Sequence, residues 1–298
     1  MSVALFAYHQ FGHLALELLL AAGVRVVCVF THEDDPDEAC WFDSVAARAR
    51  DAGIPVFTPT DVNAPEWVAR LAGFAPDVLL SVHYRYMLKR ALRRIPRLGC
   101  LNLHASLLPR YRGRCPLNWQ LVHGESQAGV TLHEMVRRAD AGAIVDQEAV
   151  AVGPDDTAME LYLKLLPAAR RVLERQLPHL ATGDWPRREQ DEAQATTFGG
   201  RRPEDGRIDW SAPSRRIHDL VRAVSRPWPG AFSDGPEGRV RVWRTRVAPL
   251  PDHVHDLAPG TTWRDAAGHT YARTGDGCLE LVEVEPAPTP TPQEQPTA

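Results

Sequence analysis

The sequence predicts an α/β protein with a Rossmann-like parallel sheet in its N-terminal part and a small β-rich, OB-like subdomain after it. The first half alternates short, continuously apolar runs with Leu- and Ala-rich segments that end at a glycine. Such alternation is typical of a parallel sheet covered by helices on both faces. Beyond Gly183 the residue pattern changes to short β-branched runs separated by Gly, Pro and Asp, which is typical of a small antiparallel β unit.

The elements of the N-terminal part follow in a regular order. The expected strands are 3–9, 24–31, 55–57, 78–83 and 100–104, and the expected helices are 14–22, 42–52 and 65–71. Two further strands, 130–135 and 143–152, precede a long amphipathic helix at 157–180. A ligand site is expected at the carboxyl ends of the parallel strands. The first strand-to-helix turn, from Tyr8 to Gly12, has one glycine where the dinucleotide fingerprint has three, which argues against a nicotinamide or flavin enzyme.

The expected domain boundaries lie where the residue pattern changes along the chain. A catalytic domain is expected over 1–183, a polar linker over 184–212 and the β-rich subdomain over 213–285. Residues 286–298 alternate Pro with Thr and Ala and lack core-forming side chains, so this tail is expected to be disordered.

Composition and charge exclude several classes of protein. The 298 residues are 44% hydrophobic and 24% charged, as in a soluble globular protein, and the net charge of -4 argues against a nucleic-acid partner. No basic N-terminal region and no apolar run of about 20 residues is present, so we expect a cytoplasmic protein without a membrane partner. The five cysteines form no Cys-x-x-Cys pair, which predicts reduced thiols and no metal site.

Asn102 and His104 stand out on the strand expected at 100–104. Side chains on a strand alternate between faces, so Asn102 and His104 share one face while the intervening leucines share the other. A lone buried histidine most often makes a hydrogen bond to loop backbone. An amide and an imidazole side by side at the carboxyl end of a strand instead favour a catalytic site.

The loops that follow contain charged residues whose role the sequence leaves open. Arg110, Arg112 and Arg114 lie in a Pro- and Gly-containing loop, where they form either a solvated basic turn or a clamp for a carboxylate or phosphate. Asp140 lies between two alanines in a short loop between two expected strands. Composition alone favours a turn-forming role for Asp140.

Three motifs follow one another along this part of the chain: Asn102-Leu103-His104, Ser106-Leu107-Leu108-Pro109 and Tyr111-Arg112-Gly113. Together with Asp140 they resemble the folate-dependent formyltransferase family, and the resemblance runs from residue 3 to about residue 245. Through Pro116-Leu117-Asn118-Trp119 and the segment 227–233, it is closest to the formyltransferase domain of the bifunctional polymyxin-resistance enzyme. That domain formylates UDP-4-amino-4-deoxy-L-arabinose.

The resemblance implies an N-formyltransferase that uses N10-formyltetrahydrofolate as a co-substrate and requires no metal. The catalytic positions of the family fall on Asn102, His104 and Asp140. The folate-contacting positions fall on Tyr86, Met87, Leu88, Arg114, Val136, Arg137, Arg138 and Ala139. At 86–88 the residue types differ from those of the formyltransferase domain of the polymyxin-resistance enzyme.

The chemistry of formyl transfer gives each of these three side chains a task. Acyl transfer to a neutral amine develops an oxyanion on the formyl oxygen, and the leaving nitrogen must gain a proton. Asn102 is suited to donate a hydrogen bond to that oxyanion, and His104 to donate to it or to move the proton. Asp140 would orient the imidazole.

The expected acceptor is the 4-amino group of UDP-4-amino-4-deoxy-L-arabinose, a sugar of lipid A modification and polymyxin resistance. The alternatives are another nucleotide-linked amino sugar, such as a dTDP-linked 4-amino hexose, and methionyl-tRNA. The loop 33–38 contains five carboxylates, which would repel the phosphodiesters of tRNA. The candidates for holding a sugar diphosphate are Arg110, Arg112, Arg114, Arg201 and Arg202. The sequence leaves open which of them do so, and whether the chain forms a homo-oligomer.

Overall fold

The computed structural model describes residues 1–33, 41–236 and 238–287. The acidic loop 33–38, whose carboxylates would repel tRNA, therefore lies outside the described residues from position 34 onward. The chain forms two compact units, each built from several stretches of sequence. Unit 1 comprises Met1–Pro116, Gln127–Ala151 and Leu163–Phe198, and unit 2 comprises Leu117–Ser126, Val152–Tyr162 and Gly199–Ala298.

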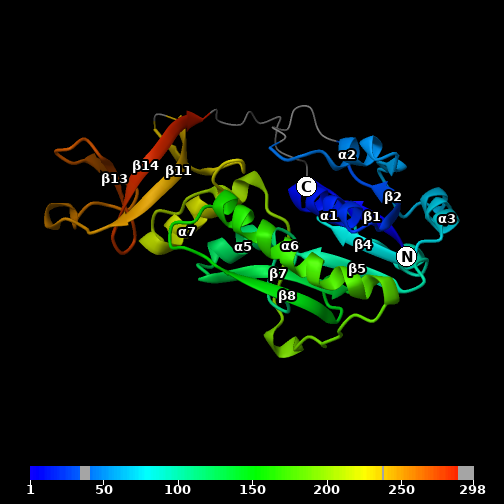
Figure 1. The fold of residues 1–298 in the computed structure, drawn as a ribbon. Coiled ribbons are helices and arrows are strands. Elements are labelled where there is room, and N and C mark those ends of the chain that lie inside the picture. The colour runs from blue at the N-terminus through cyan, green and yellow to red at the C-terminus, as the bar shows by residue number, and fades with distance from the viewer. Residues whose placement is uncertain (34–40, 237, 288–298) are drawn as a thin grey trace. The chain divides into compact units, whose positions relative to one another are not determined.

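Unit 1 contains a seven-stranded sheet with the order β3-β2-β1-β4-β5-β7-β8 (Figure 1). The strands are β1 (Ser2–Ala7), β2 (Arg25–Phe30), β3 (Val56–Phe57), β4 (Val78–Val82), β5 (Gly99–His104), β7 (Gln127–Glu134) and β8 (Ile144–Ala151). The first five of these are parallel, which confirms the predicted sheet. β7 and β8 add an antiparallel hairpin at one edge, because their short connection cannot make the crossover that parallel strands need. A separate pair, β6 (Arg112–Gly113) and β9 (Thr197–Phe198), forms a small parallel sheet.

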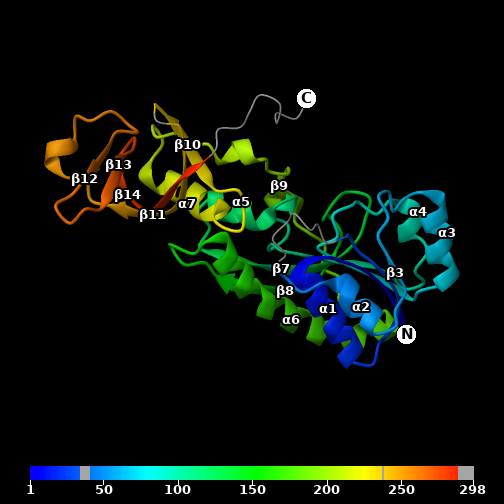
Figure 2. The same cartoon turned by 90° about the horizontal axis from the view of Figure 1, so that it is seen from above.

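Helices cover both faces of the seven-stranded sheet (Figure 2). On one face lie α1 (His9–Ala21), α2 (Val45–Asp51) and the unit 1 part of α6 (Ala158–Thr182), and on the other lie α3 (Pro65–Phe74) and α4 (Arg90–Arg93). Beneath α3 and α4, alternate strand residues such as Phe6, Phe30 and Leu79 form a buried core with Leu71 and Leu92. This two-sided burial explains the continuous apolar runs of the strands.

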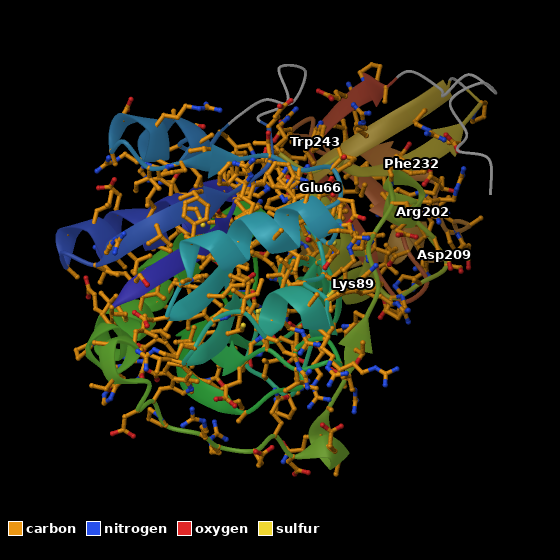
Figure 3. The ribbon with its side chains drawn as sticks, turned by 90° about the vertical axis from the view of Figure 1, so that its right-hand side faces the viewer. Glu66, Lys89, Arg202, Asp209, Phe232 and Trp243 are labelled. Carbon is orange, nitrogen blue, oxygen red and sulfur yellow. The ribbon has the colours of Figure 1, made fainter. Side chains whose placement is uncertain are left out.

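Unit 2 contains a five-stranded antiparallel sheet with the order β10-β11-β14-β13-β12, which confirms the predicted β-rich subdomain. The strands are β10 (Ala231–Gly235), β11 (Gly238–Ala248), β12 (Thr262–Arg264), β13 (Thr270–Arg273) and β14 (Cys278–Ala287), and the unit also holds α5 (Pro116–Val122) from Leu117 on and α7 (Ser214–Val224). Figure 3 labels Phe232 on β10 and Trp243 on β11.

The first two residues of the segment expected to be disordered belong to a strand. Pro286 and Ala287 end β14, where they pair with Val240 and Arg239 of β11, so the antiparallel ladder continues through them. The rest of the expected tail, 288–298, lies outside the described residues. Within the described ranges, no helix combines the length and the apolarity that a membrane span requires.

Candidate active site

Two neighbouring strands of unit 1 bring the expected polar side chains together. β7 pairs antiparallel with β5, in a register that places Asn102 opposite His133 and His104 opposite Thr131. The amide Nδ2 of Asn102 lies 3.1 Å from Nε2 of His133, and Nδ1 of His104 lies 3.7 Å from Oδ2 of Asp140. Asn102 and His104 therefore share one face of the strand, as the alternation of side chains predicted.

Asp140 reaches this face from the loop between β7 and β8. Its backbone is left-handed, with φ of 52°, a conformation that aspartate adopts more readily than most residues. Its Oδ2 accepts the backbone N–H of Gly113 at 2.8 Å, and its carbonyl oxygen accepts Nε2 of Gln190 at 2.7 Å. Gly142 lets the loop close, because a Cβ there would lie 2.0 Å from the carbonyl oxygen of Glu134. Asp140 is therefore held in place from both its side chain and its backbone.

The surroundings of Asp140 keep its carboxyl group ionised. Burial acts to raise the pKa of Asp140, but the imidazoles of His104 and His133 in their protonated forms and the backbone N–H of Gly113 together lower that pKa below its ordinary value. The side chain is only 13% exposed, so water screens its charge poorly. The carboxylate therefore stabilises a proton that arrives on a neighbouring imidazole.

The hydrogen bond of His104 decides which ring nitrogen is free to take that proton. Nε2 of His104 lies 2.8 Å from the carbonyl oxygen of Tyr111, which can only accept, so Nε2 carries a hydrogen. In the neutral ring Nδ1 then bears a lone pair, and it faces Asp140. A proton received at Nδ1 would produce an imidazolium next to the carboxylate, which is the arrangement that a proton shuttle requires.

His133 is the member of the site that the sequence analysis missed. Its Nδ1 lies 2.8 Å from the carbonyl oxygen of Glu134 and must donate, so in the neutral ring Nε2 accepts one N–H of Asn102. The same Nε2 lies 3.4 Å from Oδ1 of Asp140. The second amide N–H of Asn102 has no partner within the described residues and remains available to a substrate oxygen. The sequence pattern that could have revealed His133 is the alternation that places Thr131 and His133 on one face of the strand expected at 130–135. The register of that strand against the strand at 100–104 could not be predicted from the sequence.

The structure removes Arg112 from the five candidate anion ligands. Its guanidinium is fully buried and donates to Oε1 of Gln190 at 2.7 Å and to Oε1 of Glu192 at 2.8 Å. Both partners lie about 80 positions away in the sequence, so spacing could not reveal them. Arg112 therefore fixes the loop after β5. The other candidates are Arg110 and Arg114 in unit 1 and Arg201 and Arg202 in unit 2.

A pocket of about 860 Å³ opens beside the loop that holds Asp140. Four of the expected folate contacts line it: Met87, Leu88, Val136 and Arg137. The other four do not: Tyr86, Arg114, Arg138 and Ala139. The volume lies within the range of about 300–1,000 Å³ that is typical of small-molecule sites. Because Cys100 and Arg137 of its lining lie two and three positions before Asn102 and Asp140, the pocket is a candidate for a substrate of the same site.

Two of the expected contacts outside this lining have other partners. Nη1 of Arg138 lies 2.7 Å from Oε2 of Glu192, the residue that also holds Arg112. The ring of Tyr86 meets the ring of His32 edge-on, with centroids 5.0 Å apart. Tyr86 therefore belongs to the histidine-rich region near the ends of β2 and β4.

Three histidines lie at the carboxyl ends of β1, β2 and β4. Burial, with the charge of Arg85, lowers the pKa of His9 and of His32 to about 4 each, and burial lowers that of His83 to about 3. Nε2 of His32 accepts the backbone N–H of Arg85 at 3.1 Å, which requires an unprotonated nitrogen. His83 also interacts electrostatically with His104. A neutral aromatic and imidazole region thus adjoins the site.

Comparisons with known proteins place the chain in a family. The profile described as Formyl transferase matches residues 7–177, and the one described as Formyl transferase, C-terminal domain, matches residues 201–291. The first match alone spans more than half of the chain, so the protein belongs to the formyl transferase family. The expectation of an enzyme of this family is confirmed.

Solved structures with the same fold share little sequence with this chain. WlaRD, a sugar 3N-formyl transferase crystallised with dTDP and 5-N-formyl-THF, has 18% identity and a TM-score of 0.72, over 95% of this chain and 98% of that one. The N-formyltransferase from Helicobacter canadensis, in complex with folinic acid and dTDP-3-aminofucose, has 17% identity and a TM-score of 0.72, over 95% and 99%. HypX from Aquifex aeolicus with tetrahydrofolic acid has 17% identity and a TM-score of 0.64, and this chain covers 43% of it.

Proposed function

We propose that the protein transfers a formyl group from N10-formyltetrahydrofolate to the amino group of a nucleotide-linked amino sugar. The observation that carries this proposal is the convergence of Asn102, His104 and Asp140 next to a pocket of small-molecule size. Membership of the formyl transferase family supports the reaction type. Structural neighbours that contain a reduced folate and dTDP or a dTDP-linked amino sugar support the two substrates.

Each side chain has a role that its hydrogen bonds allow. The remaining N–H of Asn102 donates to the formyl oxygen as negative charge develops there, while its other N–H stays on His133. His104 accepts the proton of the attacking amine at Nδ1 and passes it toward the leaving nitrogen. Asp140 stabilises the intervening imidazolium from 3.7 Å. No side chain has to form a covalent bond with the formyl group.

The pocket fits the aromatic part of the folate. Met87 and Val136 offer apolar surface, and they are 56% and 41% exposed, which is unusual for large hydrophobic side chains. Large exposed apolar side chains gathered around one pocket are typical of a site that a ligand covers. The exposed apolar lining is therefore consistent with stacking of a planar ring.

The identity of the acceptor is open among nucleotide-linked sugars. The sequence resemblance favours UDP-4-amino-4-deoxy-L-arabinose, whereas two of the structural neighbours contain dTDP or a dTDP-linked 3-amino sugar. Arg110 and Arg114 are exposed in unit 1 and are candidates for the diphosphate. Arg112 is excluded because its donors are used within the fold.

A panel of acceptors tests this proposal. Purified protein is incubated with N10-formyltetrahydrofolate and, in separate reactions, UDP-4-amino-4-deoxy-L-arabinose, a dTDP-linked 3-amino sugar, a dTDP-linked 4-amino sugar and methionyl-tRNA. We expect tetrahydrofolate release and a formylated product with at least one nucleotide sugar and none with the tRNA. Formylation of the tRNA alone would refute the proposed acceptor class.

A further inference from the structure

Formyl transfer to an amino sugar releases one proton that has to reach the solvent. Amines of pKa about 8–10 are about 90–99.9% protonated at pH 7, so the acceptor arrives mostly as an ammonium. An ammonium and a formyl folate give a formamide, tetrahydrofolate and one free proton. The amine thus loses two protons: one moves to the leaving nitrogen through His104, and the other leaves the site.

The second proton has no carrier among the residues described above. The fold lowers the pKa of Asp140, so this carboxylate does not retain a proton at neutral pH. Both ring nitrogens of His133 are engaged, Nδ1 with the carbonyl oxygen of Glu134 and Nε2 with the amide of Asn102. The proton that the ammonium loses before attack therefore needs a path past these residues.

Two further histidines lie where the topology of the sheet opens a crevice. β1 is flanked by β2 on one side and by β4 on the other, so the connections that follow β1 and β4 lead away from each other. His9 lies just after β1, and His83 follows β4 directly. We propose that His83 and His9 form a proton relay, which takes the proton from the acceptor ammonium and passes it to the solvent. This inference rests on the proposed function, because the proton comes from the acceptor amine.

His83 is placed to receive a proton from an amine that reaches His104. β4 and β5 are parallel neighbours with Val82 opposite Leu103, so one residue later the chain brings His83 and His104 to the same end of the sheet. The two imidazoles interact electrostatically. The ring of His83 stacks on the ring of Phe11, with centroids 4.3 Å apart and 11° between the planes, and this packing fixes its orientation.

His9 lies next to His83 and has an unsatisfied ring nitrogen. The centroids of the two rings are 6.4 Å apart. One water molecule, with a hydrogen bond of about 2.9 Å on each side, spans up to about 5.8 Å and so connects a nitrogen of one ring with a nitrogen of the other. Nδ1 of His9 is buried and has no hydrogen-bond partner within the described residues. Such atoms are rare in folded proteins and indicate an ordered water or a chemical role, and the relay provides both.

The surroundings of the relay keep it free of a resting proton. Burial, with the charges of Arg85 and His32, lowers the pKa of His9 to about 4. Burial, with the charges of His9 and His104, lowers the pKa of His83 to about 3. His32 is not part of the relay, because its Nε2 already accepts the backbone N–H of Arg85 at 3.1 Å. The other ring neighbours are aromatic: Tyr8, Trp41 and Phe42 around His9, and Phe11 beside His83.

A weakly basic relay passes a proton on and does not retain it. The imidazolium of His83 is a stronger acid than an ammonium of pKa about 8–10, by a factor of about 10⁵–10⁷. Proton transfer that is uphill by this factor still occurs about 10⁶–10⁸ times per second. Typical kcat values of about 1–10³ s⁻¹ are slower, so the intact relay does not limit turnover. Without the relay, departure of the proton should become the slow step.

The dependence of turnover on buffer tests the relay. kcat of the full chain is measured at pH 7 in a dilute, bulky buffer, with and without added imidazole. The substrates are N10-formyltetrahydrofolate and the nucleotide sugar of the acceptor panel that is formylated fastest. The test variants are His83→Asn and His9→Asn, because asparagine does not titrate in this range and tolerates the left-handed backbone of both positions, with φ of 55° and 58°.

Two control variants and a binding measurement accompany the test. His32→Gln removes a histidine of the same region while its side-chain oxygen can still accept the N–H of Arg85. His253→Gln removes an exposed histidine of unit 2. Calorimetry with 5-formyltetrahydrofolate reports whether each variant is folded, and His83→Gln is the second substitution at position 83 if His83→Asn does not fold.

We expect kcat of wild type and of both controls to be independent of imidazole. His83→Asn and His9→Asn should each lower kcat by about 100-fold, and added imidazole should recover about tenfold or more of this loss. Folate should bind both test variants within a fewfold of wild type. A wild-type kcat in either test variant would overturn the relay. So would a loss of turnover that imidazole does not reverse, since a purely structural change produces that result.

The proposed function has a separate readout in the same proteins. Formylation of a nucleotide sugar by wild type, together with test variants that turn over like wild type, overturns the relay and leaves the proposed function intact. No formylation of any nucleotide sugar overturns the proposed function and the relay with it. A pH indicator in the wild-type reaction should record about one proton released per formyl group transferred at pH 7, and no release would contradict the proton balance on which the relay depends.

Discussion

Replacing Asp140 by asparagine removes one charge from the site while it retains the shape. Asparagine keeps an oxygen that can accept the N–H of Gly113, which now bonds to Oδ2 at 2.8 Å. It also keeps the backbone hydrogen bond from Gln190. The variant Asp140→Asn therefore tests the charge of the side chain and leaves the position of the loop largely unchanged.

The geometry gives the size of the expected effect. The carboxylate of Asp140 lies 3.7 Å from Nδ1 of His104. At that separation, with an effective dielectric constant of about 20, the attraction to an imidazolium is about 4 kcal/mol. If half to all of this attraction is present in the transition state, its loss lowers kcat by about 30- to 1,000-fold.

The assay is steady-state formyl transfer, with the folate affinity measured separately. We expect kcat of Asp140→Asn to fall by that amount while folate binds within a fewfold of wild type. The control Asp51→Asn, an exposed residue at the end of α2, should behave as wild type. A variant with Asn at position 140 that keeps a wild-type kcat would refute the role given to this carboxylate.

The same variant has a second readout in acid. Since the fold lowers the pKa of Asp140 below its ordinary value of 3.8, the ionised carboxylate stabilises the folded state above about pH 4. That contribution is lost progressively as the pH falls below this value. Chemical denaturation at several pH values below 4 should therefore show that the free energy of unfolding decreases less steeply with falling pH for Asp140→Asn than for wild type.

The remaining predictions concern catalysis, pH and the loop after β5. Asn102→Ala and His104→Ala should each lower kcat by about 100- to 1,000-fold with little change in folate affinity, as steady-state kinetics and calorimetry would show. The fold lowers the pKa of His9 and of His32 to about 4, so between about pH 6.5 and pH 4 the unfolded chain binds protons at these two histidines and the folded chain does not. The free energy of unfolding should therefore decrease as the pH falls through this range, by up to about 1.4 kcal/mol per pH unit for each histidine. Arg112→Met should lower the free energy of unfolding by about 1–3 kcal/mol in urea titrations, because the buried guanidinium loses its hydrogen bonds to Gln190 and Glu192.

Each of these predictions has a matched control or a contradicting result. Arg114→Met, at an exposed position of the same loop, should change the free energy of unfolding by less than about 0.5 kcal/mol, and equal effects at 112 and 114 would contradict the buried role of Arg112. Replacing His9 and His32 together by glutamine should flatten the dependence of stability on pH between 6.5 and 4. Wild-type turnover by His104→Ala would remove the proton shuttle from the mechanism.

Local periodicity was enough to predict the parallel strands and one face of the site. The alternation of apolar runs with helical segments predicted five strands of a parallel sheet, which the structure confirms, and the period of two placed Asn102 and His104 on one face. These inferences succeed because they depend only on residues that are neighbours in sequence. α1 nevertheless begins at His9, before the expected start, because helical hydrogen bonding starts with the N–H of Gly12 donating to the carbonyl oxygen of Tyr8.

Contacts between distant segments account for what the sequence did not reveal. Asp140 resembled a turn residue, because the N–H of Gly113 that holds it lies 27 positions away. His133 required the antiparallel register of β7 against β5, which is not encoded in either strand alone. Arg112 could not be removed from the candidate anion ligands by its sequence context, since its partner Glu192 lies 80 positions further along the chain.

The central claim is that this chain moves the formyl group of a folate onto the amine of a nucleotide-linked sugar. A single reaction with isotope-labelled N10-formyltetrahydrofolate tests it directly, with mass spectrometry of the nucleotide sugar and quantitation of tetrahydrofolate. We predict that the label appears on the sugar amine in equal amount to the tetrahydrofolate released, and that Asn102→Ala and His104→Ala nearly abolish both signals. Release of the label as free formate, or an unlabelled amine with every nucleotide sugar of the panel, would contradict the claim.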